Sequence, residues 1–361
     1  MRKDTITFSQ SVFTLVLFIF GSSVVLGVTS TAQQDSWLSL LLAWVMVLPL
    51  LLVYARIMRL FPETDLYDIF EILFGKVFGK IFVVLITWYA LHLCSAVLRN
   101  FTEFLQIVAM PETPQLPMML SIILVTFYLA KSGTNILGKW SLIMFIIVTL
   151  TVFFTIFMAM MDLKYENLTP VLESGLQKIA SGAFQIVTFP FAETVLFLCI
   201  AGAVSKQASS YKLYIFASLA GGGILLLVII RNITILGPAM INASYFPSYT
   251  AARILHIGNF ISRIEGSITM NFLLAGITKI TLCLIAASKG IAKVFAIEDH
   301  KQMLMPTSML VVALCAIVYK STMEMFGFLK YYQVYALPFQ VFIPLVVWIT
   351  AEIHAKKRSA S

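Results

Sequence analysis

Ten stretches of predominantly apolar residues run through the chain, and they constrain its fold more than any other feature. A helix needs about 20 such residues to cross the hydrocarbon core of a bilayer. Backbone groups in that core have no water to bond, so only helices and closed barrels can cross it. These stretches have the length of helices. The expected spans are residues 8–29, 36–57, 78–99, 117–131, 138–161, 183–204, 211–234, 266–288, 303–320 and 333–353.

The composition supports a membrane protein. Hydrophobic residues make up 60% of the chain and charged residues 12%, whereas soluble domains have about 45–50% and about 25%. This excludes a soluble enzyme, a disordered chain and a nucleic-acid-binding protein, and the net charge of +8 fits basic cytoplasmic loops. We therefore expect an all-α integral membrane protein, with residues 1–361 forming one polytopic domain in the lipid bilayer.

The distribution of basic residues predicts an orientation. Lys and Arg accumulate in the cytoplasmic loops of membrane proteins. If the N-terminus is cytoplasmic, most of the 25 basic residues lie on the cytoplasmic side, and the loop 30–36 on the other side has none. Ten spans return the C-terminus to the starting side. Both termini are therefore expected to be cytoplasmic.

Two of the expected spans are interrupted near their middles. The first contains Gly21, Ser22 and Ser23; glycine weakens a helix by about 1 kcal/mol relative to alanine, and serines compete for backbone hydrogen bonds. The sixth contains Pro190, which removes an amide donor and clashes with the preceding turn. Glu193 follows it, and a carboxyl group near the membrane midplane indicates function by default.

The two interruptions lie five spans apart. Ten helices then divide into two sets of five, with repeat one at about 8–161 and repeat two at about 183–353, and the odd number gives the repeats opposite topology. Inverted repeats with broken helices in corresponding positions indicate a binding site at the midplane. Freed amides suit a carboxylate and freed carbonyls suit an ammonium group or cation, and an amino acid carries both. Glycine, serine and proline also serve ordinary packing in membrane helices. The prediction of a binding site therefore rests on the two breaks together and not on either one alone.

Other polar residues within the spans have two readings each. Tyr89 and His92 in span three lie near one helical face, where His92 could relay protons or could be a packed, hydrogen-bonded residue. Lys279 in span eight could snorkel toward the nearer membrane surface. It could also place its ammonium group beside the break in span one, instead of a bound cation. Arg263 and Glu265, at the outer end of span eight, could pair with each other or with a neighbour.

The remaining residues carry no recognisable catalytic or metal chemistry. The sequence has no catalytic triad, no phosphate-binding loop and no metal-ligand spacing, so we expect no catalytic residue, metal or cofactor. The four cysteines lie singly within spans and are expected to be packing residues. The glycines at 221–223 should permit close helix packing. Arg99, Asn100 and Glu103 are expected to mark the outer boundary of span three.

Several segments resemble one family. They are LFPETDLYDIFEILFGKVFGKI at 60–81, FPFAETVLFL at 189–198, AARILHIGNFISRIEG at 251–266, FSQ at 8–10 and DSWL at 35–38. Together they resemble the B subunit of GerA-type spore germinant receptors, the spore germination permease family of the amino acid–polyamine–organocation transporter superfamily. Ala192 stands where this family usually has glycine. The loop around Gly133 lacks the acidic residue often found there.

The resemblance implies a LeuT-like fold of five plus five inverted helices, with helices one and six discontinuous. It also implies a receptor in the inner membrane of an endospore, with A and C partner subunits, whose B subunit binds a small-molecule germinant such as an amino acid. Lys279 and Glu193 would lie at the pocket. The implied substrate-binding residues are Gly21, Ser22, Ser23, Val24, Tyr89, Phe189, Pro190, Phe191, Ala192, Glu193, Ala275 and Thr278.

Three functional hypotheses remain open on the sequence. The first is a nutrient sensor that triggers germination through its partner subunits, with Glu193 as the group that senses the ligand. The alternative is a proton- or ion-coupled amino-acid transporter, in which Glu193, His92 or Lys279 couples protonation to conformational change. The third is a scaffold that binds no ligand and anchors the other subunits.

Overall fold

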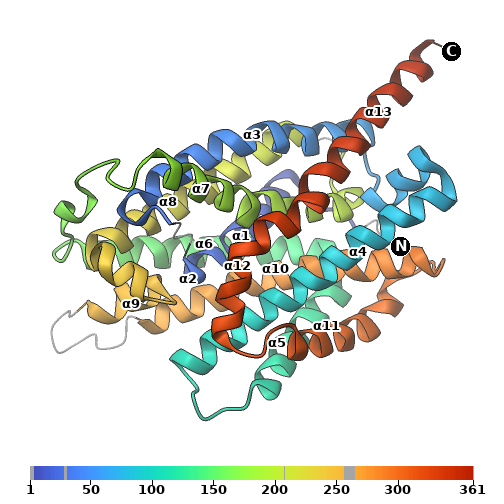
Figure 1. Cartoon of the computed structure of the whole chain (residues 1–361). Coiled ribbons are helices and arrows are strands. Elements are labelled where there is room, and N and C mark those ends of the chain that lie inside the picture. The colour runs from blue at the N-terminus through green and yellow to red at the C-terminus, as the bar shows by residue number, and fades with distance from the viewer. Residues whose placement is uncertain (1–3, 28–30, 207, 256–264, 361) are drawn as a thin grey trace.

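The computed structural model describes residues 4–27, 31–206, 208–255 and 265–360. Within these ranges nine helical segments are long and apolar enough to cross a membrane, and span one is a tenth, in two pieces. Both termini lie at the same end of the bundle (Figure 1), as an even number of spans requires. The elements that build the bundle are α1 (Phe8–Phe20), α2 (Ser23–Leu26), α3 (Ser36–Leu60), α4 (Leu66–Val108), α5 (Gln115–Ser132), α6 (Thr134–Ala159), α7 (Leu176–Ile186), η3 (Val187–Phe191), η4 (Ala192–Ala203), α8 (Ser210–Ala243), α9 (Pro247–Ile254), α10 (Glu265–Val294), α11 (Leu304–Val318), α12 (Thr322–Leu337), η6 (Pro338–Phe342) and α13 (Ile343–Ala360).

Span one is broken where the sequence predicts. Helix α1 begins with a capping box, in which the side chains of Thr7 and Gln10 each accept a hydrogen bond from the other residue's amide. It ends at Phe20, and the amide of Gly21 still donates to the carbonyl oxygen of Leu17 at 2.8 Å. Helix α2 resumes at Ser23. The break therefore covers the two residues between them.

Span six is irregular over most of its length. Helix α7 leads into the π-helical turn η3, where Phe189 has the non-helical angles φ −136° and ψ 109° directly before Pro190. The chain then continues as the narrower 3-10 helix η4. Proline cannot supply the amide that a continuous α-helix needs at this point, so the predicted break is confirmed.

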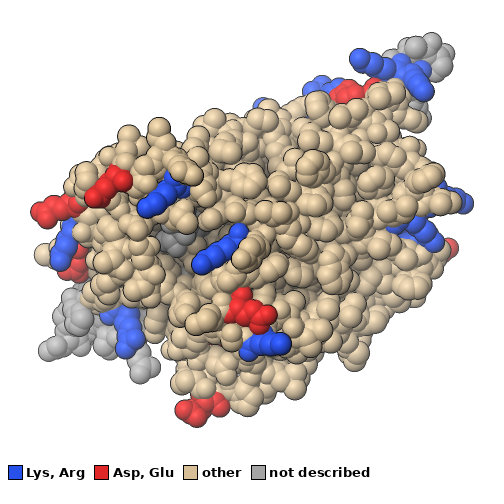
Figure 2. Space-filling model, viewed as in Figure 1, with Lys and Arg blue, Asp and Glu red and all other residues tan. Residues whose placement is uncertain are grey.

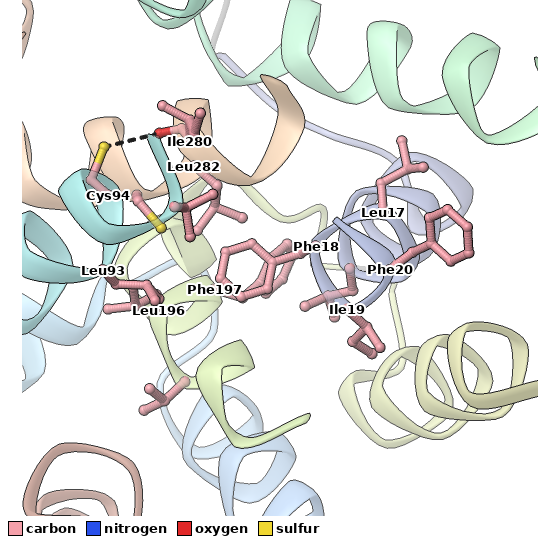
Figure 3. Packing of buried hydrophobic residues seen from close by; sticks show 14 of the residues in the cluster. Leu17, Phe18, Ile19, Phe20, Leu93, Cys94, Leu196, Phe197, Ile280 and Leu282 are labelled. Atoms are coloured by element: carbon pink, nitrogen blue, oxygen red, sulfur yellow. Dashed lines mark hydrogen bonds between the residues drawn. The ribbon is translucent and has the colours of Figure 1, made fainter. Parts of the chain in front are cut away.

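The hydrophobic core surrounds α1 and η4. Figure 3 shows Phe18 of α1 beside Phe197 of η4, with side chains of α4 and α10 close by. A helix that is apolar on all sides is a buried one, and α1 is buried along most of its length. The thiol of Cys94 donates to the carbonyl oxygen of Ile280 at 3.6 Å. All four cysteines are free and buried, as expected for packing residues.

Glycines allow α8 to lie close to the core. A Cβ atom on Gly221 would lie 3.1 Å from Ile19 Cγ2, and one on Gly222 would lie 3.2 Å from Phe191 Cζ. Both contacts are tighter than ordinary packing allows, so the expected role of these glycines is confirmed. Gly223 has no atom within 4 Å of such a Cβ and takes no part in this contact.

The residues expected to mark the outer boundary of span three are buried among neighbouring helices. Helix α4 continues to Val108, and Arg99, Asn100 and Glu103 are buried inside the protein. Arg99 Nη2 lies 2.7 Å from Glu103 Oε1, which neutralises both charges. The hydroxyl of Thr322 and the side-chain amide of Gln115 also donate to Glu103, at 2.6 and 2.7 Å. These partners from other helices make burial possible, and a single helical segment does not reveal them.

Polar contacts join the segments at the end of the bundle that holds the termini. The carboxylate of Asp4 accepts hydrogen bonds from the amides of Thr134 and Asn135 at 2.8 Å. Asp4 therefore supplies an acidic group to the loop that lacks one of its own. Asp65 accepts from Lys289 Nζ at 2.6 Å and from the amide of Gly202 at 2.8 Å, which ties α4 to α10 and η4. Figure 2 shows that most of the surface on this side of the molecule carries no charged side chain.

Candidate functional site

A buried ion pair lies where the two broken spans meet. Lys279 Nζ of α10 contacts Glu193 Oε2 of η4, and both side chains are fully buried. The ammonium group also donates to the hydroxyl of Ser22, in the break of span one, at 3.1 Å. It lies 5.1 Å from the ring centroids of both Phe18 and Phe189, a distance at which cation–π attraction operates. Of the two positions considered for Lys279, the structure therefore shows the one beside the break in span one.

The other oxygen of the carboxylate is bonded to span ten. The hydroxyl of Tyr332, on α12, donates to Glu193 Oε1 at 2.6 Å. Tyr332 and Tyr89 share a hydroxyl–hydroxyl bond of 2.9 Å. Gln340 Nε2 then donates to the hydroxyl of Tyr89 at 2.7 Å and to the carbonyl oxygen of Thr188 at 2.9 Å. Glu193 and Lys279 thus have several buried partners each, as stable buried charges require.

A tyrosine of α3 completes the arrangement. The hydroxyl of Tyr54 lies 2.5 Å from the carbonyl oxygen of Gln340 and 3.3 Å from that of Ala192. These carbonyls belong to the irregular turns of spans ten and six, where backbone groups lack regular helical partners. We call the connected set the central network; its members are Ser22, Tyr54, Tyr89, Glu193, Lys279, Tyr332 and Gln340.

Three members of the central network, Tyr54, Tyr332 and Gln340, were not among the expected site residues. Gln340 carried a usable signal, since it is an amide within the apolar stretch 333–353 and follows Pro338 by two residues. Proline and an intramembrane polar residue indicate a third helix irregularity, and the structure has the π-helical turn η6 there. Tyrosine is common at the ends of membrane spans, so Tyr54 and Tyr332 gave no comparable signal.

The expected residues of span one lie in different surroundings. A Cβ on Gly21 would lie 3.0 Å from Lys279 Cδ, so this glycine allows the lysine to cross the break. The hydroxyl of Ser23 donates to the carbonyl oxygen of Ile19 at 2.8 Å and joins the two halves of the span. Val24 points away from the network and lines a small cavity of about 10 Å³ beside α8.

The expected residues of spans six and eight are mostly buried around the ion pair. Pro190, Phe191 and Ala192 precede Glu193 and are buried. Ala275 and Thr278 are buried on α10, and the hydroxyl of Thr278 has no hydrogen-bond partner among the described residues. Thr278 thus places a hydroxyl group that could form a further hydrogen bond directly next to Lys279 in the sequence.

His92 does not join the central network. Its ring packs against Trp88, Phe328 and Tyr335, with centroid distances of 6.1, 5.6 and 4.8 Å. Its Nδ1 atom has no hydrogen-bond partner within the described part of the chain. The structure therefore agrees with the interpretation of His92 as a packed residue. The hydrogen bond expected of such a residue is not seen at its Nδ1 atom among the residues described. Arg263 and the side chain of Glu265 lie outside the described residues, and so does their suggested pair.

The carboxylate and the ammonium group of the site neutralise each other inside the protein. The two groups meet across the junction of spans six and eight. Ser22 of span one and Tyr332 of span ten hydrogen-bond the pair directly, and the other members of the central network are linked to it through further hydrogen bonds. Among the described residues, no group of three or more His, Cys, Asp and Glu could hold a metal ion. The ion pair places one group of each charge at the same point between the two helix breaks.

Comparison with known proteins places the fold. The chain has TM-scores of 0.66 with the crystal structure of MhsT in complex with L-phenylalanine and 0.65 with Mhp1, a nucleobase-cation-symport-1 family transporter. The match to MhsT covers 97% of this chain and 89% of that protein. The match to Mhp1 covers 93% of this chain and 76% of that protein, and the sequence identity is 12% in both cases. Identity this low establishes the fold alone. The fold is the LeuT-like arrangement of five plus five helices, with helices one and six discontinuous.

Sequence comparison places the family. The chain is 25% identical to spore germination protein KB of Bacillus subtilis (strain 168) over 366 residues, which cover 100% of this chain and 98% of that protein. It is 24% identical to the putative spore germination protein YfkT of the same organism, over 88% of this chain and 87% of that one. The family described as spore germination protein matches residues 5–325. This multi-pass membrane chain therefore belongs to the spore germination protein family.

Proposed function

We propose that this chain is the B subunit of a spore germinant receptor and binds a small zwitterionic nutrient, such as an amino acid, at the central network. Binding would trigger germination through A and C partner subunits. We place the receptor in the inner membrane of the spore, with both termini on the core side. Family membership supports the biological role. The observation that supports this site is the buried pair of Glu193 and Lys279 between the two helix breaks.

A zwitterion suits this site because it can replace both charges of the pair. The ligand carboxylate would bind Lys279 and its ammonium group would bind Glu193, so neither buried charge loses a counter-charge. Ser22 and Tyr332 would then exchange their present bonds for bonds to the ligand. A ligand shifts a conformational equilibrium only by its difference in affinity for the two states. Here that difference would come from breaking bonds that join spans one, six, eight and ten.

The test is ligand-induced thermal stabilisation of the chain in nanodiscs, with a panel of amino acids and sugars. Gly21→Leu should fill the space that Lys279 occupies, and Gly223→Leu is the matched control, because a Cβ there meets nothing within 4 Å. A ligand at about 100 times its Kd stabilises a protein by about 2.7 kcal/mol. We expect a shift for a zwitterion in the wild type and in Gly223→Leu, and none in Gly21→Leu.

Two outcomes would contradict the proposal. No shift for any ligand, even with the A and C subunits present, would favour the scaffold. Accumulation of the same ligand in proteoliposomes, driven by a pH gradient and without partner subunits, would favour the coupled transporter, which the fold equally allows. The sensor should bind without comparable uptake.

A further inference from the structure

An apolar groove opens on the outer side of the bundle. It lies between α3, span six and the end of span ten, and its volume is about 810 Å³, within the usual range of about 300–1,000 Å³ for ligand clefts. The groove faces outward, since Met46 and Leu52 on its wall are 43% and 41% exposed. We call it the side groove; its apolar lining includes Met46, Leu50, Val53, Phe184, Val341 and Leu345.

The length of the side groove matches one leaflet of a bilayer. Its wall on α3 runs from Met46 to Arg56, about 15 Å at 1.5 Å per residue. Its wall on η6 and α13, from Val341 to Glu352, has a similar length. The hydrocarbon core is about 30 Å thick, so the groove extends across about half of it. A partner helix that crosses the membrane would need about twice this length, whereas the acyl chain of one leaflet would not.

The two ends of the side groove differ in chemistry. One end is apolar and lies against the irregular turns, where Val341 adjoins Gln340 of the central network. The other end carries the ion pair of Arg56 with Glu352, at 2.5 and 3.1 Å, and the ring of Tyr211. This is the polarity of a lipid, with an apolar tail toward mid-membrane and a polar group at the surface.

A second pocket continues from the polar end. Tyr211 also lines this pocket, whose volume is about 290 Å³. Arg59 and Lys206 face it together with one carboxylate, that of Glu63, so positive charge is in excess. The guanidinium carbon of Arg59 lies 5.6 Å from the centroid of the Tyr211 ring, and the described residues provide Arg59 with no ion-pair partner. A phosphate group with one negative charge would neutralise the excess.

We propose that the side groove and this pocket bind one anionic phospholipid. An acyl chain occupies the side groove, and the phosphate lies between Arg59 and Lys206. A basic residue near a membrane surface contributes about fivefold to the binding of an anionic lipid (about 1 kcal/mol), so two should favour an anionic lipid over a zwitterionic one by about 25-fold.

Native mass spectrometry of the purified, delipidated chain tests the assignment. Phosphatidylglycerol and phosphatidylcholine with identical acyl chains are added in competition. We expect preferential retention of phosphatidylglycerol, a loss of that preference in Arg59→Gln/Lys206→Gln, and a loss of retention in Val53→Trp, which fills the groove. Leu150→Trp is the matched control, because Leu150 is a 64% exposed residue of α6 outside the groove. Leu345→Trp is a second filling variant, and melting without added lipid identifies any variant that fails to fold.

Three results would overturn the proposal. The first is equal retention of the two lipids by the wild type. The second is unchanged retention of phosphatidylglycerol by the folded variants Val53→Trp and Leu345→Trp. If these variants instead lose a partner subunit that co-purifies with the wild type, the groove binds a protein helix. The third is competition by soluble glycerol phosphate as strong as that by the whole lipid, since the acyl chain would then add nothing. None of these depends on the nutrient site.

Discussion

Replacing Glu193 by glutamine isolates the electrostatic part of the central network. Glutamine keeps the shape of the side chain and can still accept the hydrogen bond from Tyr332. It leaves the ammonium group of Lys279 fully buried, with the hydroxyl of Ser22 and two aromatic rings as its neighbours. Removing one partner of a buried ion pair costs about 3–5 kcal/mol. A neutral hydrogen bond contributes about 0.5–1.5 kcal/mol, so the rest of the network is too weak to offset this loss.

The double variant Glu193→Gln/Lys279→Met separates charge from packing. Both charges are removed while the side-chain volumes are nearly kept, and such replacements of buried ion pairs are often neutral. The double variant should therefore be more stable than Glu193→Gln alone, by about 2 kcal/mol or more. This difference is the interaction energy that a double-mutant cycle measures for residues in contact.

The assay is thermal unfolding in nanodiscs without ligand, followed by intrinsic tryptophan fluorescence. A loss of 1 kcal/mol lowers the Tm of chains of 150–250 residues by about 2–4 °C, and somewhat less in a longer chain. Glu193→Gln should therefore melt at least about 5 °C below the wild type, with the double variant in between. If the single variant melts with the wild type, or if the double variant is less stable than the single, the pair does not hold these helices together.

Three further predictions use the same melting assay. Tyr332→Phe removes a donor to the buried carboxylate and should cost about 1–3 kcal/mol, whereas Tyr335→Phe, outside the central network, should change little; equal losses would contradict this. Gly276→Ala places a methyl group about 1.5 Å from a phenylalanine ring of α4 and should cost at least about 1–3 kcal/mol, while Gly223→Ala, with open space around it, should be tolerated. Asp65→Asn removes a half-buried ion pair with α10 and should cost about 1 kcal/mol, and its stability should respond less to added salt than that of the wild type.

The bilayer explains why the spans and their breaks could be predicted from the sequence. A crossing helix needs a long apolar stretch and must satisfy its own backbone groups, so span lengths are evident in the order of residues. The same requirement makes Pro190 and the glycine and serines at 21–23 conspicuous. Glu193 follows from the cost of a charge in the membrane. All of these are local properties of one segment.

The missed features depend on contacts between segments. The sequence places Arg99 and Glu103 at the end of a span, but it does not reveal the partners on α5 and α12 that allow them to be buried. His92 is one helical turn from Tyr89, yet it faces an aromatic cluster rather than the ion pair. Tyr332 enters the site only because α12 lies against the break in span six. Helical periodicity identifies a face, but the neighbour of that face depends on the tertiary packing.

At the proposed nutrient site, the buried pair would select a ligand with both charges over one with a single charge. A carboxylate alone would bind Lys279 and leave Glu193 unpaired, and an amine alone would do the reverse. Either case carries the cost of about 3–5 kcal/mol for an unpaired buried charge, which corresponds to a loss of affinity of about two to three and a half orders of magnitude. A zwitterion would avoid this loss because it would replace both partners together. The discrimination would therefore come from the charges already buried in the protein, before any contact with the side chain of the ligand.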